Sequence, residues 1–211
     1  MNVPGERLTR RREQAERRRE QLLDAAMSVF GSRGVEVAST REVAAAAGVT
    51  PGLLYHYFES KEALAVAVVA ERGFLPELRQ LLSESTGHSA AVVLPRVLSG
   101  FSQLLAERAE LVALFFSGAI NNERIREGLK TVVAEGQQLL ADYLAARVAR
   151  GELREHDTTA AAQMLLAPIV LGQVAGFAVD PVAVGGVLAK GLTTQGTGQH
   201  TGRPDRKGEG K

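Results

Sequence analysis

Seven arginines lie between Arg7 and Arg19, and only Glu13 and Glu16 oppose them, so this segment carries a local charge of +5. The whole chain of 211 residues carries +1, which leaves −4 for the remainder. Guanidinium groups bind phosphate oxygens through paired hydrogen bonds, so such a segment can lie along a nucleic-acid backbone. The pattern therefore indicates a basic arm, with a charged, solvent-exposed extension of the next helix as the alternative.

The histidines do not form a recognisable site. His56, His88, His156 and His200 lack metal-ligand spacing, and the chain has no cysteine, no phosphate-binding glycine loop and no nucleophile motif. We therefore predict no metal site, no cofactor and no enzyme activity. The absence of cysteine, of a signal-peptide pattern and of an apolar run of about 20 residues favours a cytoplasmic protein without membrane contact.

Helix-capping residues predict a series of short helices after the arginines. Residues 39–42 read Ser-Thr-Arg-Glu, which is the spacing of a capping box, and Thr50-Pro51 and Ser60 are typical starts of the next two helices. Gly48 permits a sharp turn between the first two. A short helix, a glycine turn and a second short helix are typical of a DNA-binding helix-turn-helix, and also of a helical hairpin in any all-α core.

The rest of the chain also has helical periodicity. From Phe74 onward apolar residues recur at helical spacings and no alternating strand pattern occurs, so we predict an all-α fold. A long amphipathic helix is expected to end at Gly151. Asp157 and Asp180 are expected to cap the last two helices, over about 157–178 and 181–192. Residues 193–211 contain no aliphatic or aromatic side chain and are expected to be disordered.

One stretch combines several specific features: residues 22–26, Phe30, Gly34, and residues 39–44, 47–50, 52–58 and 60–64. In this order and with these gaps, residues 17–68 resemble the N-terminal DNA-binding domain of the TetR (tetracycline-repressor-type) family of bacterial regulators. The remainder matches only the general plan of the family. The resemblance implies a basic N-terminal arm (1–16), a three-helix helix-turn-helix domain (17–68), a larger helical-bundle domain for ligand binding and dimerisation (69–192), and a disordered tail (193–211).

The resemblance implies that residues 50–58 form the helix that enters the major groove of DNA. Pro51, Gly52 and Leu53 depart from family members with polar residues there, so hydrogen-bonded base readout would depend on other side chains. Thr40 and Lys61 match positions that hold phosphates in the family. The predicted DNA-contacting residues are Thr40, Arg41, Thr50, Pro51, Gly52, Leu53, Tyr55, His56, Tyr57 and Lys61.

Several of these residues can have roles other than DNA binding. Lys61 and His56 can be ordinary solvated side chains, and Thr40 can be a simple neighbour of the helix cap. Tyr55 and Tyr57 can be core or interface aromatics, and we expect at least one of them to be partly buried.

The larger domain is expected, from the resemblance, to hold a small-molecule effector among its middle helices. The absence of a cluster of charges that looks buried favours a neutral or largely apolar effector. Each candidate lining residue can instead be ordinary core. The candidates are Phe101, Leu105, Phe115, Phe116, Tyr143, Met164 and Phe177.

The last two predicted helices are expected to form a four-helix interface in a homodimer. Small residues there would allow close packing between chains or, equally, within one chain; they are Ala160, Ala161, Ala162, Gly172, Ala175 and Gly176. The resemblance thus implies a sequence-specific transcriptional regulator, a ligand-responsive repressor that binds a near-palindromic DNA operator as a dimer and is released by a small molecule. An activator of the same family, and a helical enzyme or interaction protein without DNA binding, are the alternatives.

Overall fold

The structure, a computed structural model, describes residues 4–84 and 87–193. Within those residues all regular structure is α-helical apart from one β-bridge, between Leu153 and Thr193, so the predicted all-α fold is confirmed. The predicted disordered tail lies outside the described residues, except for Thr193. The helices are α1 (Pro4–Arg33), α2 (Thr40–Ala46), α3 (Pro51–Tyr57), α4 (Lys61–Arg72), α5 (Leu75–Ser83), α6 (Ala90–Glu107), α7 (Ala109–Asn121), α8 (Glu123–Ala149), α9 (Thr158–Ala175) and α10 (Pro181–Leu192).

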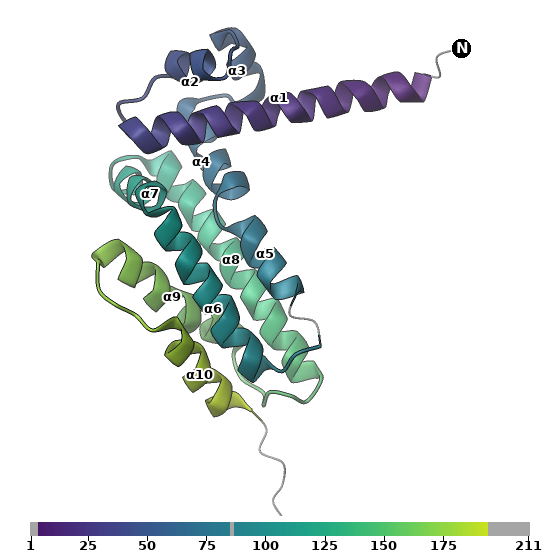
Figure 1. Ribbon diagram of the computed structural model, residues 1–211, viewed down its shortest axis with the longest axis vertical. Coiled ribbons are helices and arrows are strands. Elements are labelled where there is room, and N and C mark those ends of the chain that lie inside the picture. The colour runs from purple at the N-terminus through teal and green to yellow at the C-terminus, as the bar shows by residue number, and fades with distance from the viewer. Residues whose placement is uncertain (1–3, 85–86, 194–211) are drawn as a thin grey trace, which may run out of the picture.

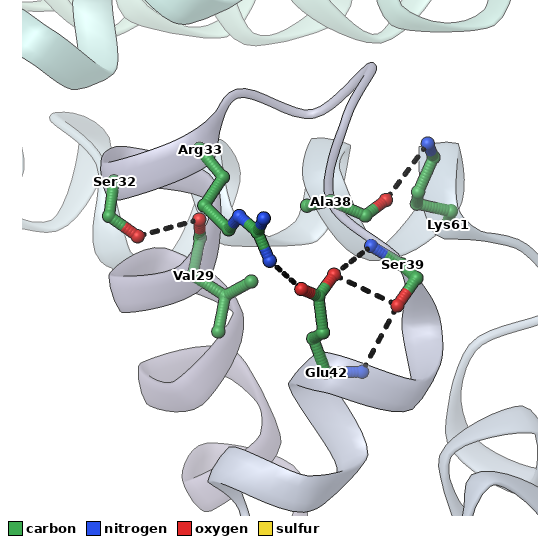
Figure 2. Close-up of polar contacts among 7 residues, drawn as sticks. All are labelled: Val29, Ser32, Arg33, Ala38, Ser39, Glu42 and Lys61. Atoms are coloured by element: carbon green, nitrogen blue, oxygen red, sulfur yellow. Dashed lines mark hydrogen bonds and ion pairs between the residues drawn. The ribbon is translucent and has the colours of Figure 1, made fainter.

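The predicted capping residues begin the short helices. At α2 the Ser39 hydroxyl accepts a hydrogen bond from the Glu42 N–H, and the Glu42 carboxylate accepts the Ser39 N–H at 2.8 Å, so the capping box is complete (Figure 2). Thr50 caps α3 directly ahead of Pro51. Gly48 has a φ of 65°, which side-chain-bearing residues rarely adopt, and it makes the turn between α2 and α3.

The first helix is much longer than a helix-turn-helix requires. α1 has 30 residues, so the predicted basic arm continues from Pro4 into the rest of the helix without a break. This is the charged helical extension named above as the alternative; the boundary at residue 16 stays a prediction. Arg10, Arg11 and Arg12 are exposed. Figure 1 shows α1 lying across the top of the bundle, with its N-terminal half reaching beyond α2 and α3.

A single hydrophobic core joins the first helices to the larger bundle. Leu22 and Phe30 of α1 and Leu54 of α3 are fully buried, and the cluster continues through α4 to Phe115 of α7 and Ile125 of α8. Burial of this apolar surface is the main force that holds α1–α3 against the bundle. The predicted boundary between the two parts, between residues 68 and 69, lies within α4, and the shared core extends across it.

A second core holds α6, α8, α9 and α10 together. Gly185 of α10 lies so close to α6 that a Cβ there would be 2.8 Å from the backbone nitrogen of Pro95, so only glycine permits this approach. Asp157 and Asp180 cap α9 and α10 as predicted. Fully buried leucines form the centre of this core: Leu94, Leu98, Leu140, Leu144 and Leu165.

α9 is unusually apolar. Among the described residues it is the helix whose length and mean hydropathy of 1.4 would suffice to cross a membrane, a requirement that core helices also meet. It contacts α6 and α8, and Figure 1 shows it with α10 along one side of the bundle. Of the small residues predicted to allow close packing, Ala161, Ala162 and Gly172 are buried within the chain, Ala160 is partly buried, and Ala175 and Gly176 are exposed.

Candidate nucleic-acid interface and ligand cavity

α3 has one face in the core and the opposite face in solvent. Leu54 is fully buried, and Phe58, which ends the helix, is 4% exposed. A short helix that is anchored on one side and free on the other has the geometry needed to enter a DNA groove. The exposed residues are Thr50, Pro51, Gly52, Tyr55 and His56, and Leu53 is partly buried.

Two hydroxyl groups connect α2 to α3. The oxygen atoms of the Thr40 and Tyr55 hydroxyls lie 3.1 Å apart. Thr40 is partly buried and Tyr55 is 51% exposed, and the neighbouring Arg41 is exposed. An anion at this point would therefore meet two hydroxyl groups, those of the predicted DNA-contacting residues Thr40 and Tyr55, which the sequence had not paired with each other.

Lys61 has a structural partner that the sequence did not indicate. Its Nζ donates hydrogen bonds to the backbone oxygens of Glu36 and Ala38, both at 3.1 Å, and Figure 2 shows the contact with Ala38. Both carbonyls belong to the loop that leads into α2. Lys61 thus fixes this loop from the start of α4, and because an ammonium has three N–H donors, one remains for a phosphate.

The two aromatic residues at the end of α3 differ in exposure. Tyr57 is partly buried and contacts the shared core, which meets the expectation that one tyrosine would be partly buried. The ring of His56 meets the Tyr57 ring edge to face, with centroids 5.4 Å apart. Tyr57 therefore supports the exposed His56 ring at the end of the helix.

The last arginine of the basic segment has a partner in the fold. Arg19 pairs with Glu71 of α4, and its guanidinium carbon lies 5.1 Å from the centroid of the Phe58 ring. Arg17 pairs with Glu13 along the exposed surface at 3.5 Å, and exposed pairs of this kind contribute little to stability. Arg19 therefore holds α1 against α4. The exposed arginines of the segment are Arg10, Arg11, Arg12 and Arg17.

A second candidate site is an apolar cavity of about 420 Å³ inside the larger bundle. Helices α4 to α9 all contribute to its lining. The structure places four of the predicted effector-contacting residues in this lining: Phe101, Leu105, Phe115 and Phe116.

The structure does not bring the other three predicted residues to the cavity. Tyr143 lies beside Arg147, whose guanidinium carbon is 4.8 Å from the tyrosine ring centroid, and burial raises the pKa of Tyr143 to about 12. Met164 and Phe177 are 67% and 50% exposed. Because α9 is apolar on all sides, its sequence does not distinguish the inward face from the outward face on which Met164 lies.

Much of the cavity wall comes from residues that the sequence analysis did not select. On α8 these residues recur at spacings of three and four, so the helical periodicity of α8 could have indicated them. On α4 and α5 they are one valine and two leucines, and an aromatic residue just before α5, without a distinguishing pattern. The unselected lining residues on these helices, with Phe74 just before α5, are Leu129, Val132, Val133, Gly136 and Gln137, then Val69, Phe74, Leu75 and Leu78.

Arg108, at the junction of α6 and α7, binds the backbone at the end of α4, next to the cavity wall. Its Nη1 donates to the backbone oxygen of Arg72 at 2.8 Å and also to that of Gly73, and its Nη2 donates to Glu77. Phe74 directly follows these carbonyls and lines the cavity. One arginine therefore joins three helices next to a cavity wall.

Comparison with known proteins gives two family matches. Residues 22–68 match the model described as bacterial regulatory proteins, tetR family, and residues 116–174 match the C-terminal domain of AefR-like transcriptional repressors. A curated relative, the HTH-type transcriptional regulator BetI of Rhizobium meliloti (strain 1021), is 34% identical over 114 residues, which are 52% of this chain. The chain spans 55% of the length of that relative.

Solved structures share the fold. A crystal structure described as that of a TetR-family transcriptional regulator from Mesorhizobium loti MAFF303099 has a TM-score of 0.69 at 18% identity, covering 83% of this chain and 95% of that one. The regulator FadR of Bacillus subtilis, in complex with stearoyl-CoA, has a TM-score of 0.65 at 23% identity, covering 83% of this chain and 97% of that one. At these identities the likeness shows a common architecture.

Proposed function

Because the chain belongs to the TetR family of bacterial regulatory proteins, we propose that it is a sequence-specific DNA-binding transcriptional regulator, and specifically a ligand-responsive repressor. The observation that carries this proposal is the anchored α3, in which buried Leu54 fixes a helix whose opposite face is exposed. In this proposal residues 17–68 bind DNA, residues 69–192 bind the effector and dimerise, and the protein acts in the cytoplasm.

The chemistry of the exposed groups around α3 separates those that suit base edges from those that suit the DNA backbone. Thr50 and Arg41 carry donors for base edges, while Pro51, Gly52 and Leu53 can contact thymine methyl groups. The other polar groups suit the sugar-phosphate backbone and the groove wall, which position the protein without reading sequence. This second set is Thr40, Tyr55, His56, Tyr57 and Lys61.

The DNA-binding form is a homodimer in this proposal. Exposed large apolar side chains gather on one side of the chain, on α9, on α10 and on the segment between them, and such patches mark interaction surfaces. A second copy on this face would cover them and would place two α3 helices about one turn of DNA (roughly 34 Å) apart on a near-palindrome. The side chains are Met164, Leu171, Val174, Phe177, Val182 and Val187.

Release from DNA is a shift between two populations of the dimer. An effector in the cavity presses on Phe74, and the Arg108 hydrogen bonds to the carbonyls of Arg72 and Gly73 transmit the change to the end of α4. The favoured dimer then no longer presents its α3 helices to successive major grooves. By linkage, operator DNA weakens effector binding by the same factor.

A mobility-shift titration of the full chain with the DNA upstream of its own coding sequence tests this proposal. We expect a saturable complex that contains two chains per duplex, because a single helix-turn-helix contacts too few base pairs to be selective. DNA of equal length and unrelated sequence, at the same salt concentration, is the control. Equal retardation of both DNAs would contradict the proposal.

Removing residues 1–16 is expected to weaken the salt dependence of operator binding. The slope of log affinity against log salt falls by about 0.9 for each phosphate contact that is lost, and Arg10, Arg11 and Arg12 are exposed cations that can make such contacts. Binding titrations from 50 to 200 mM salt measure this slope. A second variant keeps residues 1–16 but replaces Arg10, Arg11 and Arg12 with glutamine. An unchanged slope in both variants would show that residues 1–16 do not contact DNA.

A further inference from the structure

Among the described residues that line the cavity, one has a polar side chain, Gln137 on α8. Gln137 is partly buried, and its amide forms no hydrogen bond with any residue that the structure describes. An amide offers an acceptor oxygen and two N–H donors to a ligand that enters the cavity. The cavity therefore has one point at which a ligand can gain a hydrogen bond.

Charge is absent from the described cavity wall. None of the lining residues is an aspartate, glutamate, lysine, arginine or histidine. At its exposed edge, Val133, Leu171 and Val174 are apolar as well. A carboxylate, an ammonium or a phosphate in this cavity would lose its water without meeting an opposite charge, which is more costly than the apolar contact can offset.

We propose that the effector is an uncharged, largely apolar molecule with one hydrogen-bonding oxygen, such as a ketone, ester or alcohol, and that Gln137 binds this oxygen. A cavity of about 420 Å³ lies in the range of about 300–1,000 Å³ that is usual for small-molecule sites. The assignment rests on the proposed function because it takes this cavity as the effector site. It adds the chemical class of the effector and the residue that orients it.

Displacement of the neutral fluorescent probe N-phenyl-1-naphthylamine from the full chain tests the assignment. The competitors are two ketones (2-undecanone and butyrophenone), the hydrocarbon butylbenzene, and two acids (undecanoate and 4-phenylbutanoate). We expect both ketones to bind at least tenfold more tightly than the acids. Gln137→Leu is expected to weaken ketone binding about tenfold and to leave butylbenzene within twofold, because it removes one hydrogen bond and keeps the apolar wall.

Two further variants serve as controls. Gln138→Leu changes the next residue, which is exposed and hydrogen-bonds Asp142, and should leave every affinity unchanged. Gly136→Leu adds a bulky side chain to the cavity wall, at a position where a Cβ would already contact Leu75 at 3.5 Å, and should prevent binding of the probe itself. Thermal unfolding establishes that each variant is folded.

Three results would overturn the assignment: acids that bind as tightly as the ketones, equal losses for butyrophenone and butylbenzene in Gln137→Leu, or no displacement by either ketone. None of these titrations contains DNA. If the chain shows the expected ligand selectivity but binds no operator, the proposed regulatory function is wrong and the ligand assignment stands. If the chain binds operator but lacks the selectivity, the ligand assignment is wrong and the proposed regulatory function stands.

Discussion

Arg147→Ala is expected to lower the free energy of unfolding by about 3–5 kcal/mol, because it leaves the partly buried carboxylate of Glu152 without the cation that pairs with it. Arg147 is 6% exposed near the end of α8. Its guanidinium donates hydrogen bonds to the backbone oxygen of His88 at 2.7 Å and to Glu152 at 2.8 Å, and it faces the Tyr143 ring. The Glu152 carboxylate also accepts the N–H of Ala90, the first residue of α6, so the cluster connects the end of α8 to the start of α6.

Denaturant unfolding measures this loss, and Arg150→Ala is the matched control. Arg150 is exposed three residues further along the chain, and its replacement should change stability by no more than about 0.5 kcal/mol. A loss below about 1 kcal/mol for Arg147→Ala would contradict the account, because an ion pair that costs so little to break behaves as a solvated one.

The same cluster gives the stability a pH dependence. Burial acts to raise the pKa of Glu152, but the hydrogen bonds from the Ala90 N–H and from Arg147 outweigh it and lower the pKa. A carboxyl whose pKa is lowered by folding stabilises the protein above its ordinary pKa, and this contribution disappears as the pH falls through the lowered value. Below the ordinary value of 4.5, the wild type should lose stability more steeply than Glu152→Gln.

Leu54→Ala is expected to lower the free energy of unfolding by about 2–5 kcal/mol and to abolish operator binding at assay concentrations. Leu54 is fully buried and is the contact by which α3 reaches the core shared with α1 and α4. Truncation leaves a cavity beneath a helix of 7 residues, and a helix this short is not stable without its packing. Denaturant unfolding and DNA titration measure the two effects.

His56→Ala is the matched variant on the exposed face of the same helix, and it is expected to affect operator binding without affecting stability. His56 is exposed on the face of α3 that we propose binds DNA, so its replacement should change stability by no more than about 0.5 kcal/mol while it weakens operator binding. If Leu54→Ala retained wild-type operator affinity, α3 would not be the DNA-binding element of this chain.

Helix starts could be predicted from the sequence because their signals are local. Ser39, Thr50, Asp157 and Asp180 each satisfy a backbone N–H within three residues, and all four cap the predicted helix. Gly48 likewise adopts the left-handed conformation that its turn requires. The exposed face of α3 also followed from local pattern, because the family motif fixes which residues of this short helix point inward.

Contacts between distant residues could not be predicted in the same way. The hydrogen bonds of Lys61 to a loop 23 and 25 residues earlier depend on how α4 crosses α1, which no local spacing encodes. Met164 and Phe177 show the same limit, because only packing decides which face of an apolar helix is buried. Gln137 could not be predicted as a cavity residue because a pair of glutamines on an amphipathic helix has the pattern of a solvent-exposed face.

The most direct test of the central claim is selection of bound DNA from a random pool by the full chain at a stated salt concentration. The account predicts enrichment of a near-palindrome whose half-sites are centred about one helical turn apart, because two α3 helices read it together. The Leu54→Ala variant should enrich nothing from the same pool. Failure of the wild type to enrich any near-palindrome would contradict the account.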